Sequence, residues 1–85
     1  MNAIVKAPQD ITVDMNEPFY IDRKGVSTKA TISNSTIRKL ELNGQFPKRI
    51  TLSHNKIVWV HAEVHNWCIL VKKLKGYPKE GYYTE

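Results

Sequence analysis

The chain has 85 residues, a single cysteine and a formal net charge of +5 at pH 7. This length suits one domain with one small core, and a single cysteine excludes an intramolecular disulfide. The single cysteine also fits a reducing compartment. No stretch approaches the length of a membrane span, and no signal peptide is visible.

The positive charge is concentrated in the middle of the chain. Residues 1–22 contain one lysine and four acidic residues, whereas residues 23–75 contain eleven lysines and arginines and two acidic residues. A central segment with a net charge of +9 favours a polyanionic partner. A basic surface that is merely soluble is the alternative, because charge alone does not separate the two.

Two short helices are predicted after an N-terminal segment without helical period. Residues 1–17 contain only short β-like pieces, and we interpret them as a flexible arm, with an ordered strand as the alternative. Asp22 can cap a first helix that runs to residue 30, although Gly25 weakens it by roughly 1 kcal/mol relative to alanine. A short turn then leads into a second helix, and this order predicts a helix-turn-helix.

The second helix begins at a good capping residue, Ser33, and ends before Gly44. Ile37 and Leu40 share its inner face. Its outer face is polar and carries Asn34, Ser35, Arg38 and Glu41, with Lys39 to the side. Asparagine and arginine make bidentate hydrogen bonds to adenine and guanine edges, so we predict a DNA recognition helix. The carboxylate of Glu41 would repel phosphate, and it either accepts from a cytosine amine or points away from the DNA.

A β-hairpin is predicted next, because residues 49–52 and 56–60 alternate polar and apolar side chains around a polar turn. The alternation places Ile50 and Leu52 on one face of the hairpin, together with Ile57 and Trp59. A basic hairpin after a helix-turn-helix is a wing, whose polar side chains would contact phosphates or a minor groove. These side chains are Lys48, Arg49, Asn55 and Lys56.

A longer helix is predicted from about residue 62 to Gly76. Its apolar stripe has the spacing of one helical face and consists of Val64, Trp67, Cys68 and Val71. Trp59 and Trp67 fall on apolar faces, so we interpret both as core residues and not as base-stacking residues. Residues 77–85 are predicted to form a flexible tail.

Three side chains near the start of this helix are candidate metal ligands, namely His61, His65 and Cys68. They can share one helix face, but a fourth ligand is not evident, and the glutamate in H-A-E-V-H is one position late for a zinc-protease motif. Packing explains Cys68 more simply. We therefore expect no metal, no cofactor and no catalytic residue.

Several motifs occur together in an order that resembles the AlpA family of small phage regulators and excisionases. They are S-N-S-T-I-R-K-L from Ser33, N-G-Q-F-P-K-R-I-x-L from Asn43, Trp59, and E-V-x-x-W from Glu63. The resemblance covers residues 19–71. It departs from the family pattern at the usual leucine (Lys29), at the usual glutamate of the first helix (Gly25), at the usual turn glycine (Thr31) and at a frequent arginine (Asn34).

The resemblance implies a mostly helical α+β fold, a winged helix-turn-helix akin to the DNA-binding domain of MerR-type regulators, which we place at residues 18–76. It implies double-stranded DNA as the partner. Together with the wing residues, the expected DNA-binding set is Ser33, Asn34, Ser35, Thr36, Arg38, Lys39, Lys48, Arg49, Asn55 and Lys56.

The function expected first is that of an excisionase, which bends attachment-site DNA, assists a tyrosine-type integrase and associates with further copies on the DNA. The alternatives are a transcriptional regulator of prophage genes and, from another class, a protein–protein adaptor that uses the basic face. Each of these functions fits the cytoplasm of a bacterial host and needs no membrane.

Overall fold

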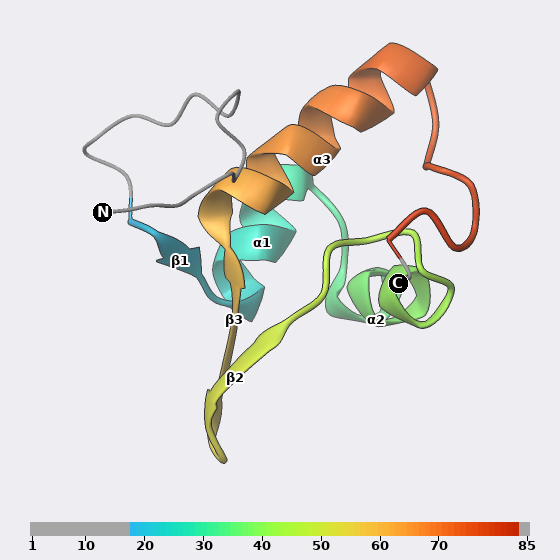
Figure 1. Cartoon of the computed structure of the whole chain (residues 1–85). Coiled ribbons are helices and arrows are strands. Elements are labelled where there is room, and N and C mark those ends of the chain that lie inside the picture. Colours follow the sequence, from blue (N-terminus) through green and yellow to red (C-terminus); the bar gives the residue numbers. More distant parts are fainter. Residues whose placement is uncertain (1–17, 84–85) are drawn as a thin grey trace, which may run out of the picture.

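The structure, a computed structural model, describes residues 18–83. Within this range the chain forms a three-helix body with a small antiparallel sheet (Figure 1). Its elements are β1 (Tyr20–Ile21), α1 (Arg23–Ala30), α2 (Asn34–Leu42), β2 (Ile50–Ser53), β3 (Lys56–Val60) and α3 (His61–Leu74). The predicted fold class, a mostly helical α+β winged helix-turn-helix, is confirmed. The predicted arm, residues 1–17, lies outside the described residues.

Both predicted capping residues start their helices. The Asp22 carboxylate accepts from the backbone N–H of Gly25 at 2.9 Å, and the Ser33 hydroxyl accepts from the backbone N–H of Thr36 at 3.2 Å. Each bond satisfies a donor that the first helical turn leaves unpaired. The sequence therefore predicts the start of both helices correctly.

The end of α2 follows from the backbone freedom of Gly44, which adopts a φ of +69°. This conformation lets the N–H of Gly44 reach the carbonyl of Glu41 at 3.0 Å and the N–H of Gln45 reach that of Leu40 at 2.8 Å. The pair of bonds is a Schellman motif, in which glycine is favoured because it has no Cβ. The chain is thereby turned out of α2 toward the wing.

Gly25 allows β1 to lie close to α1. A Cβ atom at this position would lie only 2.7 Å from Cγ1 of Ile21, which is nearer than side chains approach one another. Ile21 in turn pairs with Trp59 in the sheet. The glycine that weakens α1 as an isolated helix is therefore required by the packing of β1 against it.

The turn between α1 and α2 contains a strained residue. Thr31 adopts a φ of 59° and ψ of 44°, the left-handed region, where its N–H bonds to the carbonyl of Ser27. This region is unfavourable for a β-branched side chain, and it explains why a glycine is expected at this position.

Replacing Thr31 with glycine is expected to raise the free energy of unfolding by about 1 kcal/mol, because the strain disappears and the exposed side chain leaves no cavity. Urea titration followed by circular dichroism measures the change. The control is Thr28→Gly, at an exposed helical position of α1 with ordinary φ, where glycine should destabilise the protein. Destabilisation by both substitutions would contradict the prediction.

The sheet has the strand order β1–β3–β2, and β1 is a strand that the sequence analysis did not predict. Tyr20 pairs with Val60 and Ile21 pairs with Trp59, so the start of the described chain covers one edge of β3. A two-residue strand shows no alternation, and its partner is about forty positions away in the sequence. β2 and β3 form the predicted hairpin, which projects from the helical body (Figure 1).

The predicted faces of this hairpin are wrong. Ile50 lies opposite Val58, and opposed residues in an antiparallel pair point to the same face. Ile50 is therefore on the opposite face from Trp59. The cause is a bulge between Thr51 and Ser53, which shifts the register by one residue and leaves Leu52 50% exposed.

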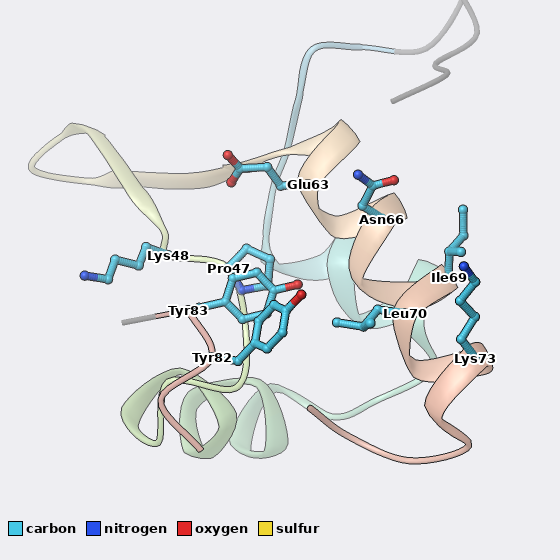
Figure 2. Close-up of a pocket in the computed structure, with 9 residues that line it drawn as sticks. All are labelled: Pro47, Lys48, Glu63, Asn66, Ile69, Leu70, Lys73, Tyr82 and Tyr83. Atoms are coloured by element: carbon cyan, nitrogen blue, oxygen red, sulfur yellow. The ribbon is translucent and has the colours of Figure 1, made fainter. Parts of the chain in front are cut away.

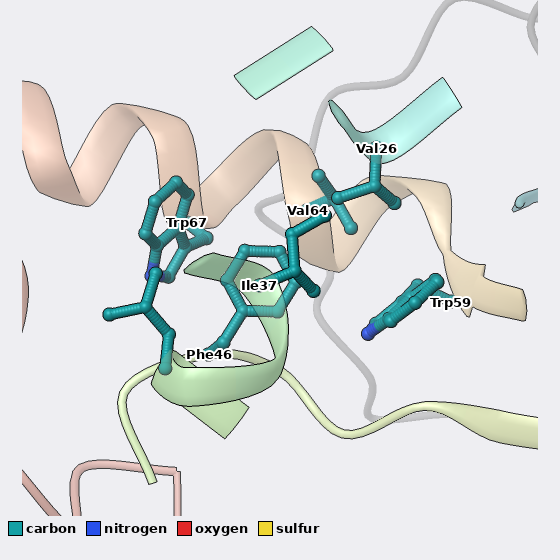
Figure 3. Packing of buried hydrophobic residues seen from close by; sticks show 7 residues of the cluster. Val26, Ile37, Phe46, Trp59, Val64 and Trp67 are labelled. Carbon is teal, nitrogen blue, oxygen red and sulfur yellow. The ribbon is translucent and has the colours of Figure 1, made fainter. Parts of the chain in front are cut away.

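All three helices, the α2–β2 loop and β3 contribute to one apolar core (Figure 3). Phe46, from the loop, lies between the two tryptophans, with ring centroids 6.3 Å from Trp59 and 4.8 Å from Trp67 in edge-on arrangements. Trp59 and Trp67 are 0% and 2% exposed, which confirms them as core residues. The other buried members are Val26, Ile37, Leu40 and Val64.

The predicted stripe of α3 faces the core, with Cys68 and Val71 packed at its margin. The helix begins at His61 and ends at Leu74, and the next residue, Lys75, adopts a left-handed conformation with a φ of 58°. No helix within residues 18–83 has the length and apolar character to cross a membrane.

Residues 77–83, expected to be part of a flexible tail, pack on the domain. The backbone N–H of Gly81 donates to Asn43 at 2.9 Å, that of Tyr83 donates to Gly44 at 2.9 Å, and the Tyr77 ring stacks on Trp67. The described part of this segment therefore continues the domain beyond the boundary predicted at residue 76.

Candidate nucleic-acid interface

The start of α2 presents an exposed polar surface, as the sequence predicts. Asn34, Ser35 and Arg38 line a concavity of about 320 Å³, and Lys39 is exposed on the same helix outside it. Two further arginines, Arg23 and Arg49, and the edge of Ile37 complete the lining. The structure thus brings four of the ten predicted residues together in one basic hollow: Asn34, Ser35, Arg38 and Arg49.

Ser33 and Thr36 form hydrogen bonds within the protein at the start of α2. The Ser33 hydroxyl accepts from the backbone of Thr36 and donates to its side-chain oxygen at 2.9 Å. Ser35 Oγ lies 3.3 Å from Ser33 Oγ. These hydroxyls stabilise the first turn of α2, whereas the Asn34 and Arg38 side chains have no hydrogen-bond partner within residues 18–83 and can reach a ligand.

Arg49 is held at the base of the wing by Glu41. Its Nε donates to both carboxylate oxygens at 3.1 and 3.2 Å, its Nη2 donates to Oε1, and its guanidinium lies 5.5 Å from the centroid of the Trp59 ring. Glu41 Oε2 also accepts from Trp59 Nε1 at 3.1 Å. The hydrogen bond with Glu41 raises the pKa of Arg49 above its ordinary value, although partial burial opposes this.

This network shows where the Glu41 carboxylate points, which the sequence left open between a cytosine amine and a direction away from the DNA. Its carboxylate is 8% exposed and points to Arg49 and Trp59, so it accepts hydrogen bonds within the protein. Arg49, 28% exposed, was predicted only as a wing contact to DNA, and the structure gives it a second role. It joins the base of the wing to α2.

The other predicted wing residues lie apart from the concavity. Asn55 and Lys56 are exposed at the hairpin tip, where Lys56 also lines a shallow hollow of about 340 Å³ between β1 and the hairpin. Lys48 is exposed and faces a different hollow beside α3. Their roles in DNA binding stay predictions.

Arg23 was missed by the sequence analysis. It follows the capping Asp22 as the first residue of α1 and lines the concavity with Asn34, Ser35 and Arg38 of α2. A cation in the first turn is unfavourable for helix stability, because the helix dipole is positive there. Lys24, the next residue, is also a cation in the first turn, so this feature of the sequence does not by itself distinguish Arg23.

The candidate metal ligands do not form a site. His61 is 7% exposed with Nδ1 3.2 Å from the carbonyl of Pro18, and burial raises the pKa of the Cys68 thiol, with Lys29 opposing the shift. Among residues 18–83, no group of three or more histidine, cysteine or acidic side chains is arranged to hold a metal ion.

A larger hollow, of about 570 Å³, lies between α3 and the C-terminal segment (Figure 2). Its walls include Ile69 and Leu70 from α3 and the rings of Tyr82 and Tyr83. Burial raises the pKa of Glu63 and, with Tyr82 and Glu63 nearby, raises that of Tyr83 to about 12. The two hollows share no lining residue, so this one is separate from the basic concavity.

The family model described as prophage CP4-57 regulatory protein (AlpA) matches residues 20–70, which is more than half of the chain. An uncharacterized protein of Enterobacteria phage P4, ORF88, is 27% identical over 89 residues, which cover 96% of this chain and 98% of the phage protein. No solved structure matches the chain. The match of the family model runs from β1 through most of α3 and confirms the family that the sequence motifs indicate. The chain therefore belongs to the AlpA family of prophage regulatory proteins.

Proposed function

We propose that this protein is a DNA-binding transcriptional regulator of prophage genes and that the first turns of α2 read the DNA sequence. The observation that carries the proposal is the basic concavity, in which Asn34 and Arg38 are exposed at the start of a well-capped helix. These two side chains have the donor and acceptor geometry for adenine and guanine edges. A regulatory function is also what the description of the family states.

The wing and the recognition helix are suited to act together. The hairpin projects from the helical body (Figure 1). Its base is joined to α2 through the hydrogen bonds from Arg49 to Glu41. A helix in the major groove reads bases, while basic residues of an adjacent hairpin contact the backbone. This arrangement supports sequence-specific binding by residues 18–83.

An excisionase, the function expected first from the sequence, needs the same DNA-binding surface. No observation on residues 18–83 favours DNA bending or an integrase partner over regulation, and the family description names regulation. We therefore propose the regulator. Its activity in transcription is expected to depend on Arg38 and Asn34.

Selection of duplexes from a random pool is expected to enrich one sequence motif. Arg38→Ala should then weaken binding to the selected duplex by about 1–3 kcal/mol and weaken binding to random duplex much less. Arg38 is exposed, so the melting temperature should stay close to that of the parent. Fluorescence anisotropy with the two labelled duplexes measures both affinities.

The matched control is Lys72→Ala, which removes one exposed positive charge from the last turn of α3. It should leave the ratio of specific to random binding unchanged. If no sequence is enriched, the proposed function is wrong and the protein–protein adaptor becomes the better hypothesis. If Arg38→Ala weakens both duplexes equally, Arg38 contacts phosphate and does not read a base.

A further inference from the structure

Three arginines from three separate elements line the basic concavity. Arg23 comes from the first turn of α1, Arg38 from α2 and Arg49 from the base of the wing. No carboxylate is part of this lining, although Asp22 precedes Arg23 in the chain. The concavity is therefore a local site of positive charge between α2, the first turn of α1 and the base of the wing.

The Arg49 guanidinium has a fixed orientation in this concavity. One edge, formed by Nε and Nη2, is bound to Glu41, and one face lies over the Trp59 ring. Nη1 is left without an acceptor among residues 18–83. An arginine held in this way loses less side-chain entropy when it binds a further acceptor.

Arg49 forms an ion pair with Glu41. Arg23, in contrast, has no acidic partner within residues 18–83. It is exposed and lies on the helix that precedes the recognition helix. In a helix-turn-helix the first helix crosses the DNA backbone while the second lies in the groove. Guanidinium groups bind phosphate oxygens through parallel hydrogen bonds.

We propose that Arg23 and Arg49 bind the DNA backbone at phosphate on either side of the start of α2, with Glu41 as the residue that positions Arg49. The inference rests on the proposed function and adds to it the contacts that set the register of the recognition helix. Phosphate contacts fix the orientation of a protein on DNA, while base contacts carry specificity. Arg23 and Arg49 thus place Arg38 and Asn34 against the bases.

The salt dependence of binding tests the role of Arg23. Arg23→Ala should lower the slope of log affinity against log salt concentration by about 0.9, the value of one lost phosphate contact. It should weaken binding to selected and random duplex by the same factor, unlike Arg38→Ala. Arg23→Lys, which keeps a cation, should restore most of the slope.

The matched control is Lys24→Ala, which removes the same charge from the neighbouring exposed position, outside the concavity. It should keep nearly the slope of the parent. Equal slopes for Arg23→Ala and Lys24→Ala would overturn the inference while leaving sequence-specific binding intact. A parent protein that binds neither duplex would overturn the proposed function and this inference with it.

The change in DNA affinity caused by Glu41→Gln tests whether Glu41 positions Arg49, because this role and simple charge attraction predict changes of opposite sign. Glu41→Gln makes the protein more positive by one charge, so electrostatic attraction alone would tighten DNA binding. If Glu41 positions Arg49, the substitution weakens binding to both duplexes and lowers the salt slope, by up to about 0.9. Tighter binding by a variant that melts as a folded domain would overturn the role of Glu41.

Discussion

Replacing Trp67 with alanine is expected to lower the free energy of unfolding by about 3–5 kcal/mol. The side chain is 2% exposed, packs edge-on against Phe46 and stacks on Tyr77 with ring centroids 5.9 Å apart. Its Nε1 donates to the carbonyl of Gln45 at 2.8 Å, and alanine would leave this carbonyl without its donor. The substitution therefore creates a cavity and unpairs a polar group at once.

Such a loss is large for this protein, since domains are commonly stable by only about 5–15 kcal/mol in total. Urea titration followed by tryptophan fluorescence of Trp59 and by circular dichroism measures it. Ile69→Ala is the matched control, because Ile69 lies on the same helix and is 44% exposed. It should cost no more than about 1 kcal/mol. A Trp67→Ala variant that unfolds at the same urea concentration as the parent would contradict the assignment of Trp67 to the core.

Features that depend on neighbouring residues were predictable from the sequence. Asp22 and Ser33 cap their helices, Gly44 ends α2, and the stripe that includes Val64 and Trp67 faces the core. Each of these depends on hydrogen bonds or side-chain spacing within a few residues. The same local signals place Asn34 and Arg38 on the outer face of α2, so that part of the candidate site was predictable too.

Features that depend on distant pairing were not predictable in the same way. The partner of β1 lies about forty residues away, and the bulge at Leu52, which reverses the expected faces of the hairpin, has no signature in one sequence. The packing of residues 77–83 depends on the Trp67 ring and on the carbonyls after α2. For the same reason the sequence alone does not identify Arg23 as a neighbour of Arg38.

The pairing of Glu41 with Arg49 and Trp59 is the clearest case of this limit. The three residues occur on α2, directly before β2 and in β3, and no local spacing relates them. Considered alone on the outer face of α2, a carboxylate is unfavourable for the proposed binding to DNA. In the fold it accepts hydrogen bonds from one arginine and from the N–H of a buried indole.

Replacing Glu41 with alanine is therefore expected to destabilise the protein by about 1–3 kcal/mol, because a buried hydrogen-bond donor loses its acceptor and a partly exposed ion pair loses one member. The carboxylate is 8% exposed, and its loss leaves both the Arg49 guanidinium and Trp59 Nε1 without their acceptor. Circular dichroism during thermal and urea unfolding measures the change. The control is Glu63→Ala, which removes the other acidic residue of the basic central segment from an exposed position and should cost much less.

A double-mutant cycle then measures the interaction energy between Glu41 and Arg49 apart from their other contacts. Arg49→Ala combined with Glu41→Ala should cost less than the sum of the two single losses, because the double variant buries no unpaired charge. The remaining cost should reflect Trp59 Nε1, whose acceptor is still absent. If the two losses add, Arg49 does not depend on Glu41 in solution. The base of the wing would then be joined to α2 by apolar packing around Trp59, and the bonds from Arg49 to Glu41 would contribute little to holding the wing beside this helix.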